Sequence, residues 1–378
     1  MTAAGLIFSN IHDNSLPELT RIRTIASVPF GGKYRLIDFA LSNMVNADIT
    51  KVGVITHYNY QSLLDHIGTG KDWDLARRSG GIKILPPFIT AYDNDAANKV
   101  YSTRLEALLG VMNFIGRCTE DYIVTSDCDV ICNVDISDVL RQHEASGADI
   151  TLVAKTINPA DYPLNAHNEI LSVDPEGDLV DVIDYIPSKA KEVDISMNIM
   201  VFNRLYLINA LLDAAAHGYT KFYHDLIARN LGKAKIKVYK YEGYYSLIGS
   251  LASYFDCNMK LLESDARNGL FGIKNRPVLT KVRNSPPTKY TSDAKVTNSV
   301  IADGCVIEGQ VENSIIFRGV KVGKGTIVRN CILMQNTYVG SDVALNCVIS
   351  DKNVIVKDGR VLSGHETMPF FIGKGVMI

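Results

Sequence analysis

Glycine is missing from the start of this sequence, where a nucleotide-binding protein would need it most. The chain has 28 glycines, but none lies between Gly5 and Gly31. The apolar run Leu6–Phe8 is typical of a buried first strand, and a polar loop follows it. A loop that binds a triphosphate needs glycine so that backbone N–H groups can approach the phosphate oxygens. The sequence therefore argues against a phosphate-binding loop of the usual kind after this strand.

Other absences exclude further classes of protein. The seven cysteines include no Cys-x-x-Cys pair, and no second Cys/His pair joins Cys128 and Cys132 to complete a zinc site. The net charge of −2 gives no attraction to nucleic acid or to an anionic membrane. No apolar run approaches the ~20 residues of a membrane span, and no basic segment leads into an apolar signal sequence. We therefore expect a cytoplasmic protein with reduced thiols and no nucleic-acid or membrane partner.

Residues 1–255 alternate between strand-like and helix-like segments. After Leu6–Phe8 the expected strands are Val52–Thr56, Ile82–Leu85, Tyr122–Ser126, Ile150–Lys155, Ile195–Phe202 and Lys235–Tyr241. The expected helices are Leu36–Val45, Gln61–Ile67, Arg104–Ile115, Val139–Ala145, Leu205–Ala216 and Phe222–Leu231. This alternation predicts an α/β, Rossmann-like domain with a mainly parallel sheet and helices on both faces. Ligands of such sheets bind at the carboxyl ends of the strands.

The last third of the chain has a different pattern. Residues 256–290 begin with a helix-like stretch and continue with Asn-Gly, Asn-Arg-Pro and Ser-Pro-Pro, which predicts a helix and a linker. In residues 291–378 an Asn-(Ser/Cys)-apolar-apolar motif recurs at Asn298, Asn313, Asn330 and Asn346. Apolar pairs also return every five or six residues, with glycines at the corners. The two nested periods predict a left-handed parallel β-helix of hexapeptide repeats, with an antiparallel sandwich as the alternative. We expect this domain to carry oligomer contacts.

Several motifs resemble one enzyme family. Residues 30–39 read Phe-Gly-Gly-Lys-Tyr-Arg-Leu-Ile-Asp-Phe, followed by Ala-Leu-Ser-Asn at 40–43, Gly-Val-Ile-Thr at 53–56 and Tyr-Gln-Ser at 60–62. Together with the two-domain pattern, these runs resemble the ADP-glucose pyrophosphorylases (glucose-1-phosphate adenylyltransferases) over nearly the whole chain. Members of that family make ADP-glucose and pyrophosphate from ATP and glucose 1-phosphate, for glycogen synthesis.

The resemblance fails at the nucleotide loop. The family has Gly-Gly-x-Gly-x-Arg-Leu where an ungapped alignment places residues 10–16, Asn-Ile-His-Asp-Asn-Ser-Leu. Asp13 puts a negative charge where phosphates would lie, Ser15 replaces the arginine, and Ile25 replaces a family lysine. The resemblance implies a degenerate nucleotide loop, whereas the residues alone also allow an ordinary loop that never bound a ligand.

The resemblance also fails at the metal and substrate positions. The family holds Mg²⁺ with two aspartates. Asp129 takes the first position, but Leu247 replaces the second aspartate and Ser246 the arginine beside it. Residues 103–107, Thr-Arg-Leu-Glu-Ala, replace the glycine-containing segment near the nucleotide, and Tyr185 replaces the sugar-phosphate lysine. We therefore expect no intact catalytic residue beyond the remnant Asp129, no metal site and no cofactor required by this chain, with Mg²⁺ needed by a catalytic partner.

Some family positions survive. Ser196, Phe222 and Asp225 match the sugar-binding stretches, although such residues can equally be kept for packing. Lys33 and Arg35 belong to a stretch that, in the family, lies near the site where sugar-phosphate effectors bind between the two domains. They are therefore a candidate effector site for an anion, and the alternative is a solvated helix start or a salt bridge to another subunit.

The losses fall on the residues that handle phosphate, while the apolar scaffold remains. The chain is thus similar to the non-catalytic, GlgD-type regulatory subunits of the family, which implies association with the catalytic subunit in a mixed oligomer such as a heterotetramer, with a homotetramer as the alternative. One alternative is an active sugar-phosphate nucleotidyltransferase in which Asp127 and Asp129 share a metal. Another is an acyltransferase, a chemistry hosted by many hexapeptide β-helices, with His365 as its histidine.

Overall fold

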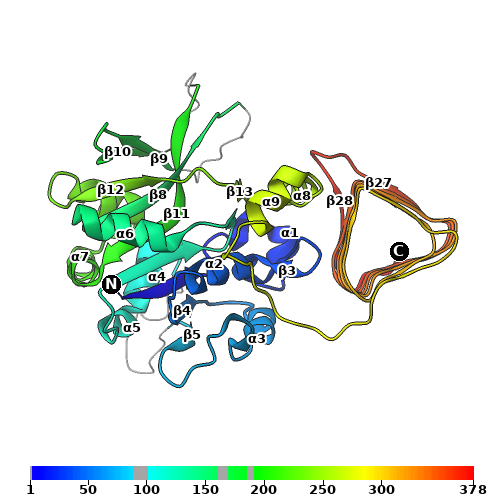
Figure 1. The fold of residues 1–378 in the computed structure, drawn as a ribbon, viewed down its shortest axis with the longest axis horizontal. Coiled ribbons are helices and arrows are strands. Elements are labelled where there is room, and N and C mark those ends of the chain that lie inside the picture. The colour runs from blue at the N-terminus through cyan, green and yellow to red at the C-terminus, as the bar shows by residue number, and fades with distance from the viewer. Residues whose placement is uncertain (1, 88–100, 161–168, 185–190) are drawn as a thin grey trace.

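The computed structural model describes residues 2–87, 101–160, 169–184 and 191–378. It contains an α/β domain and, beside it, a triangular solenoid that is seen end-on in Figure 1. The sequence-predicted Tyr185 lies outside the described residues. None of the described helices has the length and apolarity that a membrane crossing requires.

The α/β domain is built on a nine-stranded, mainly parallel sheet, as predicted. Its order is β10-β9-β11-β6-β1-β4-β5, with β8 beside β11 and β12 beside β8. The bounds are β1 Ala3–Phe8, β4 Lys51–Ile55, β5 Gly81–Leu85, β6 Tyr122–Asp127, β8 Ile150–Ile157, β9 Glu169–Val173, β10 Leu179–Asp184, β11 Val193–Asn203 and β12 Ile236–Lys240. Among these strands only β10 and β11 run against the others. β1 lies between β6 and β4, so the loop that follows it opens at the carboxyl edge of the sheet.

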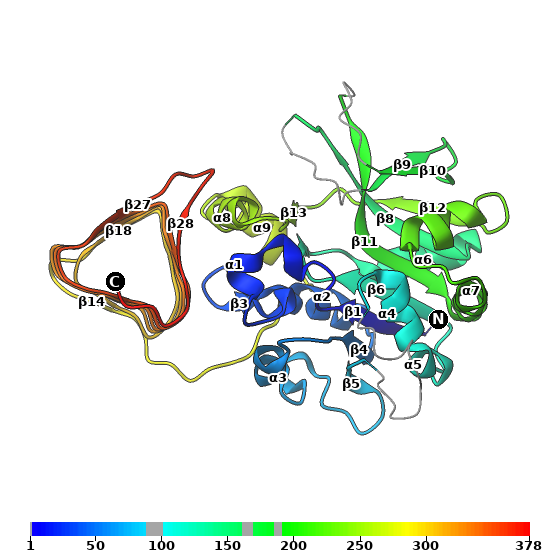
Figure 2. The ribbon, with the colours of Figure 1, turned by 180° about the vertical axis from the view of Figure 1, so that it is seen from behind.

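Helices cover both faces of this sheet (Figures 1 and 2). The helices α2 (Leu36–Val45), α3 (Gln61–Ile67) and α6 (Ile136–Ser146) pack on one face. The helices α4 (Arg104–Gly110), α5 (Met112–Gly116) and α7 (Arg204–His217) pack on the other. β1 supplies both cores, because side chains alternate along a strand: Ile7 faces the first helix layer, and Leu6 and Phe8 face the second.

Two expected helices differ in detail from the structure. The segment 104–115 is divided at Val111, whose φ of −113° ends α4 before α5 begins. The segment 222–231 is a π-helix, η4 (Phe222–Ile227), followed by a 3-10 turn, η5 (Ala228–Asn230). The wider π turn buries Phe222, Tyr223, Leu226 and Ile227 together, an arrangement that the helical period of the sequence did not indicate.

Short elements surround the carboxyl edge of the sheet. The loop after β1 forms η1 (Asp13–Ser15), α1 (Pro17–Thr20), η2 (Ile25–Ser27) and the hairpin of β2 (Pro29–Phe30) and β3 (Tyr34–Arg35). Another 3-10 turn, η3, spans Lys71–Trp73. The strands β7 (Val130–Cys132) and β13 (Tyr245–Leu247) pair antiparallel to each other just beyond β6. None of these pairings was expected from the sequence, because the strands have only two or three residues.

Two helices precede the extended connection to the solenoid. They are α8 (Leu251–Lys260) and α9 (Ser264–Phe271). The helix-like start seen in the sequence at residue 256 is the second half of α8, and α9 lies within the stretch that the sequence assigned to a linker. Residues 272–288 contain no helix or strand and lead to β14.

The C-terminal part is a parallel β-helix, as predicted, with a triangular section consistent with the left-handed hexapeptide type. Its three five-stranded sheets are β14-β17-β20-β23-β26, β15-β18-β21-β24-β27 and β16-β19-β22-β25-β28. The first contains Lys289–Tyr290, Val306–Ile307, Lys321–Val322, Tyr338–Val339 and Ile355–Val356; the second Lys295–Thr297, Gln310–Glu312, Ile327–Arg329, Ala344–Asn346 and Val361–Ser363; the third Val300–Ile301, Ile315–Ile316, Ile332–Leu333, Val348–Ser350 and Phe370–Ile372.

The recurring asparagines are corner residues of this solenoid. Asn298, Asn313 and Asn330 have positive φ values of 40°, 46° and 49°, which asparagine tolerates better than most residues. Asn298 Nδ2 donates to Asn313 Oδ1 at 2.8 Å, so neighbouring corners are linked. In the fourth coil the motif is shifted by one residue: Asn346 pairs with Arg329, and the corner with positive φ is Cys347. The 16-residue interval in the sequence reflects this shift.

The two domains share a hydrophobic core. Residues 9–35, between β1 and α2, are called the front loop. Its Leu16 and Phe30 belong to the same cluster as Tyr254 of α8 and as Phe317 and Ile349 of the β-helix. This cluster fixes the front loop between the sheet and the solenoid.

Candidate functional site

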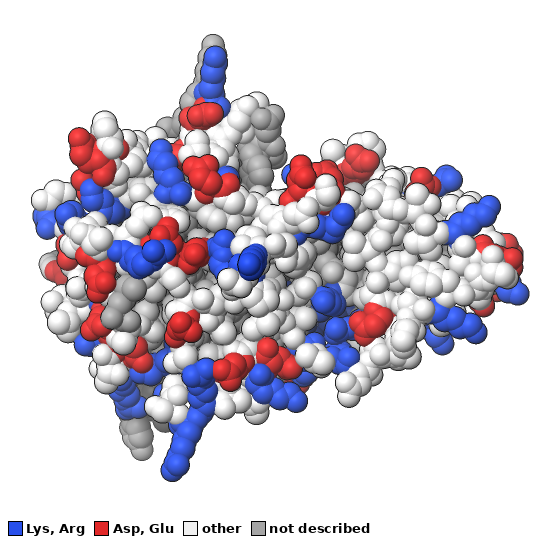
Figure 3. All heavy atoms as spheres, in the orientation of Figure 1, with Lys and Arg blue, Asp and Glu red and all other residues white. Residues whose placement is uncertain are grey.

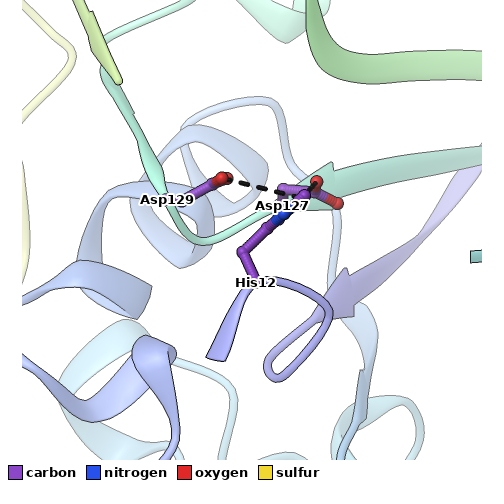
Figure 4. A group of neighbouring side chains, drawn as sticks. All are labelled: His12, Asp127 and Asp129. Atoms are coloured by element: carbon purple, nitrogen blue, oxygen red, sulfur yellow. Dashed lines mark hydrogen bonds and ion pairs between the residues drawn. The ribbon is translucent and has the colours of Figure 1, made fainter. Parts of the chain in front are cut away.

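The front loop and β6 bring three side chains together at the carboxyl edge of the sheet (Figure 4). His12 comes from the loop after β1, Asp127 ends β6, and Asp129 follows two residues later. His12 Nε2 lies 3.0 Å from Asp127 Oδ2 and 3.6 Å from Asp129 Oδ2. One ligand atom from each of the three residues lies within 4.8 Å of the other two, which is close enough to surround a metal ion.

The guanidinium of Arg104 occupies the same place. Its Nε lies 3.0 Å and 3.3 Å from the two carboxylate oxygens of Asp127, and its Nη2 also donates to Asp127 Oδ2. The same Nη2 lies 2.8 Å from His12 Nε2, the atom that faces both aspartates. Arg104 is only 8% exposed, so this ion pair is shielded from water. The pair therefore fills the space that a cation would take between His12 and Asp127.

Local structure on both sides holds Arg104 in this position. Arg104 is the first residue of α4, and Thr103 and Glu106 form a capping box at that end of the helix. Thr103 Oγ1 also donates to the Thr220 carbonyl at 2.7 Å. The guanidinium carbon lies 5.9 Å from the ring centroid of Tyr223, a cation–π contact.

Tyr223 is in turn fixed by the predicted sugar-site remnant Ser196. The Tyr223 hydroxyl lies 2.6 Å from Ser196 Oγ and donates to Asn198 Oδ1 at 2.7 Å. Asn198 stands where the family turn has glycine, and its φ of 55° keeps the left-handed conformation of that turn. Ser196 thus lies in the same group of contacts as Arg104 and orients the tyrosine beneath it.

The charges of this group are balanced unevenly. Burial alone would raise the pKa of Asp127, but Arg104 and His12 outweigh it and lower that pKa below its usual range. Burial also lowers the pKa of His12, yet Asp129 and Asp127 more than compensate, and the net shift is upward. The pKa of Asp129 is raised by burial and by the Asp127 carboxylate. Burial raises the pKa of Glu169 to about 7, against the attraction of Arg104. The single guanidinium thus neutralises Asp127 but not the whole group.

The loop that would bind a nucleotide is closed on itself. The N–H groups of Asp13, Ser15 and Leu16 donate to carbonyls within the loop. Asp13 accepts from the Ile25 N–H at 2.7 Å and from Asn10 Nδ2 at 2.8 Å, and burial raises its pKa to about 6. These contacts use three backbone donors of the loop and both oxygens of the Asp13 carboxylate, so these donors are not available to a phosphate.

The Mg²⁺ site of the family does not fit the residues present. Leu247 of β13 pairs with Val130 of β7, and the next N–H, of Ile248, donates to the Asp129 carbonyl at 2.9 Å. The second metal-ligand position is therefore next to Asp129, as the alignment implied, but it carries a side chain without a ligand atom. Asp129 Oδ1 is buried and has no hydrogen-bond partner among the described residues. We derive no catalytic step through a metal here.

The other predicted site residues lie outside this group. Phe222 is buried in the core and packs edge-to-face on Phe202, with ring centroids 6.3 Å apart. Asp225 accepts from the N–H groups of Thr220 and Lys221, at 3.1 Å and 2.9 Å, and from His224. His365 lies in the exposed hairpin between β27 and β28. For Phe222 and Asp225 the structure shows local packing and capping.

Lys33 and Arg35 line a pocket between the two domains. The remaining lining residues are Pro29, Gly32, Tyr34, His66, Lys281, Arg283, Phe317, Arg318, Gln335 and Lys352. Six of the twelve are basic, and Figure 3 shows Lys and Arg atoms gathered in the waist between the domains. Burial and the neighbouring Arg35 and Arg23 lower the pKa of Lys352 to about 7. The concentration of positive charge suits an anion.

Sequence reasoning missed the two side chains that close the site. His12 and Arg104 were noted only as replacements for family residues. The available signal was that a histidine and an arginine, both able to pair with carboxylates, fall in the two segments that align with the family's nucleotide-binding segments. Glu169 was not expected near the site, because β9 was not predicted.

Comparisons with known proteins cover both domains. The family model described as nucleotidyl transferase matches residues 14–264, and the model described as GlmU-like, C-terminal hexapeptide matches residues 286–367. The chain is 34% identical over 375 residues to the glycogen biosynthesis protein GlgD of Bacillus subtilis (strain 168), covering 99% of this chain and 96% of that protein.

Enzymes are among the relatives as well. The chain is 32% identical over 354 residues to the glucose-1-phosphate adenylyltransferase of Bacillus cytotoxicus, covering 93% of this chain and 92% of the enzyme. It is 31% identical over 350 residues to that of Bacillus cereus (strain ATCC 10987 / NRS 248), covering 92% and 91%.

Proposed function

This chain belongs to the glucose-1-phosphate adenylyltransferase family of nucleotidyl transferases, and on that premise we propose that it is a regulatory, catalytically impaired subunit of that enzyme in glycogen synthesis. It acts by associating with a catalytic subunit that makes ADP-glucose and pyrophosphate from ATP and glucose 1-phosphate. The relative named as a glycogen biosynthesis protein supports the pathway, and the altered site supports the lack of catalysis.

One observation supports the proposal: residues at the positions where the family binds nucleotide and metal contact one another instead. Arg104 and His12 contact Asp127, the N–H groups of Asp13, Ser15 and Leu16 donate to loop carbonyls, and Leu247 lies beside Asp129. At the same time the sheet, both helix layers and the β-helix are intact. A fold that is kept while its phosphate-handling residues are replaced serves binding better than chemistry.

Regulation requires that this subunit binds the active state of its partner better than the inactive state. The basic pocket between the domains, lined by Lys33 and Arg35, is proposed as the effector site for a sugar phosphate or inorganic phosphate. Binding of fructose 1,6-bisphosphate and phosphate to the purified chain, measured by calorimetry, tests this. Lys33→Met should weaken binding, and Lys321→Met, which removes an exposed lysine of β20, is the matched control.

The main experiment measures ADP-glucose synthesis by three preparations: this chain alone, the catalytic subunit alone, and the two co-expressed and purified together. The proposal expects activity near zero for the chain alone and, in the mixture, activity or effector response clearly different from that of the catalytic subunit alone. Native mass spectrometry of the mixture should show a mixed oligomer, with a heterotetramer expected. Catalytic subunit co-expressed with an unrelated protein is the control.

A second candidate is an active sugar-phosphate nucleotidyltransferase, which the proximity of His12, Asp127 and Asp129 favours. It predicts full turnover by the chain alone, in the presence of MgCl₂. That result would overturn the regulatory proposal. Inactivity without any effect on the partner would contradict both functions.

A further inference from the structure

We infer that Arg104 is a tethered cation that occupies the place of a divalent ion between His12 and Asp127, so that the folded chain excludes metal from this group of side chains. The inference deepens the proposed function, because it explains how a chain without catalytic chemistry keeps buried carboxylates at the edge of its sheet. It makes a claim about cation binding by this chain alone.

The first argument is geometric. A metal at this edge would need oxygen from Asp127 and Asp129 and a further ligand such as His12 Nε2. The guanidinium of Arg104 already contacts both oxygens of Asp127 and lies 2.8 Å from His12 Nε2. A metal bound to the same atoms would meet a fixed positive charge at contact distance. Metal and guanidinium therefore exclude each other.

The second argument concerns how firmly Arg104 is placed. Its backbone is fixed by the capping box of α4 and by the bond from Thr103 to the Thr220 carbonyl. Its side chain lies on the Tyr223 ring, whose hydroxyl is held by Ser196 and Asn198. A surface arginine that contacted an aspartate by chance would have neither support. The arrangement is built for this guanidinium.

The third argument is the loss of a metal ligand at Leu247, beside Asp129. Leu247 stands where a second carboxylate would complete a metal site, so that Asp127 and Asp129 face one tethered charge instead of a divalent ion. Asp129 is only 3% exposed, and its Oδ1 atom is buried without a hydrogen-bond partner among the described residues. Removal of Arg104 would leave two buried carboxylates and a histidine around an open space, which is a cation site.

The test is a Mn²⁺ titration of the full chain, followed by electron paramagnetic resonance of free Mn²⁺ and by the melting temperature. The variants are wild type, Arg104→Met, which removes the charge but keeps much of the volume, and the double variant Arg104→Met/Asp127→Leu. Arg229→Met is the matched control, because Arg229 contacts Asp225 at the exposed edge of the same domain, with 3.3 Å between Nε and Oδ1.

We expect wild type and Arg229→Met to show no stoichiometric Mn²⁺ site. Arg104→Met should bind one Mn²⁺ per chain at least tenfold more tightly, and MnCl₂ should raise its lowered melting temperature. The double variant should recover stability without binding Mn²⁺. The inference is overturned if wild type binds one Mn²⁺ as tightly as Arg104→Met, or if folded Arg104→Met binds none. It is equally overturned if Arg104→Met fails to fold in MnCl₂ while the double variant folds. None of these outcomes depends on the partner, so they are separate from the outcome of the activity assay.

Discussion

Arg23 of the front loop donates to Asp351 of the β-helix at 2.6 Å, and each of the two side chains is only 2% exposed. These residues are 328 positions apart in the sequence, and their contact is the most direct polar link between the two domains described above. It connects the loop that carries His12 with the residue next to Lys352 of the basic pocket. Disturbance at one of these sites can therefore reach the other through a single ion pair.

The ion pair predicts a non-additive double-mutant cycle. Arg23→Met and Asp351→Asn should each lower the free energy of unfolding by about 3–5 kcal/mol, because each leaves a buried charge unpaired. The double variant should lose much less than the sum of the two. Urea unfolding of the four proteins measures this. Arg141→Met, which breaks an exposed pair with Asp138, should cost less than about 1 kcal/mol. Single variants as mild as that control would contradict the prediction.

Lys352 predicts a pH dependence of anion binding. Its pKa is about 7 in the folded chain, lowered from 10.5 by burial and by Arg35 and Arg23, with Lys374 adding to the effect and Asp351 opposing it. Without an anion, the unfolded chain holds this proton up to about pH 10.5 and the folded chain does not, so this residue makes stability rise with pH from 7 to 10. A bound anion favours the charged form of Lys352. Anion binding therefore returns the proton to Lys352 and offsets the free-energy cost of a buried ammonium.

The affinity for sulfate, which does not titrate in this range, should therefore fall as pH rises above 7, by up to about tenfold per pH unit. Calorimetric titrations between pH 6.5 and 9 provide the measurement. Lys352→Arg should keep the binding and flatten its pH dependence, because arginine stays protonated. A flat profile for wild type would refute the role of Lys352.

The backbone conformation of Asn198 predicts that glycine and alanine substitutions at this position differ in their free energy of unfolding. Its φ of 55° is easy for glycine and costs alanine about 1–2 kcal/mol. Both substitutions lose the hydrogen bond from the Tyr223 hydroxyl, worth about 1 kcal/mol. Asn198→Ala should thus be less stable than Asn198→Gly by about 1 kcal/mol in urea unfolding. Equal stabilities would mean that the turn relaxes.

The capping box of α4 predicts a modest loss of stability. Thr103→Ala removes the acceptor for the Glu106 N–H, at 3.2 Å, and should cost about 1 kcal/mol. Thr119→Ala changes an exposed threonine outside any helix and should stay within about 0.5 kcal/mol. Thermal unfolding of both variants measures this difference in stability. If the cap positions Arg104 as described, Thr103→Ala should also weaken the exclusion of Mn²⁺ from the site, which the same titration detects.

The fold was predictable because its signals are local. Helix α2 was expected with the same bounds as observed, and the β-helix followed from its repeating asparagines and apolar pairs. The hairpin of β9 and β10 was missed although the sequence carries a signal for it: Asp-Pro-Glu-Gly at residues 174–177 is a turn signal between the two strands. Helix α9 was missed because Asn-Gly near its end resembles a turn.

The site was only half predictable. The alignment identified what was lost, at residues 10–16 and at Leu247, because a missing glycine or carboxylate is visible in the sequence. It could not identify what took the empty place, because the contact of Arg104 with Asp127 and His12 depends on where α4 begins relative to β1 and β6. Arg104 is 23 residues from Asp127 and 92 residues from His12 in the sequence, so no local pattern encodes these contacts.

The front loop is closed on itself by the hydrogen bond between Asp13 and Ile25 and is attached to the β-helix by the ion pair between Arg23 and Asp351. In an enzyme, a loop at this edge must yield each time a nucleotide enters and a product leaves. A regulatory subunit of the kind proposed above does not turn over nucleotide, so its loop can keep a fixed contact with the solenoid. In the mixed oligomer proposed above, a displacement of the solenoid by a neighbouring subunit would therefore be passed to the sheet through the front loop.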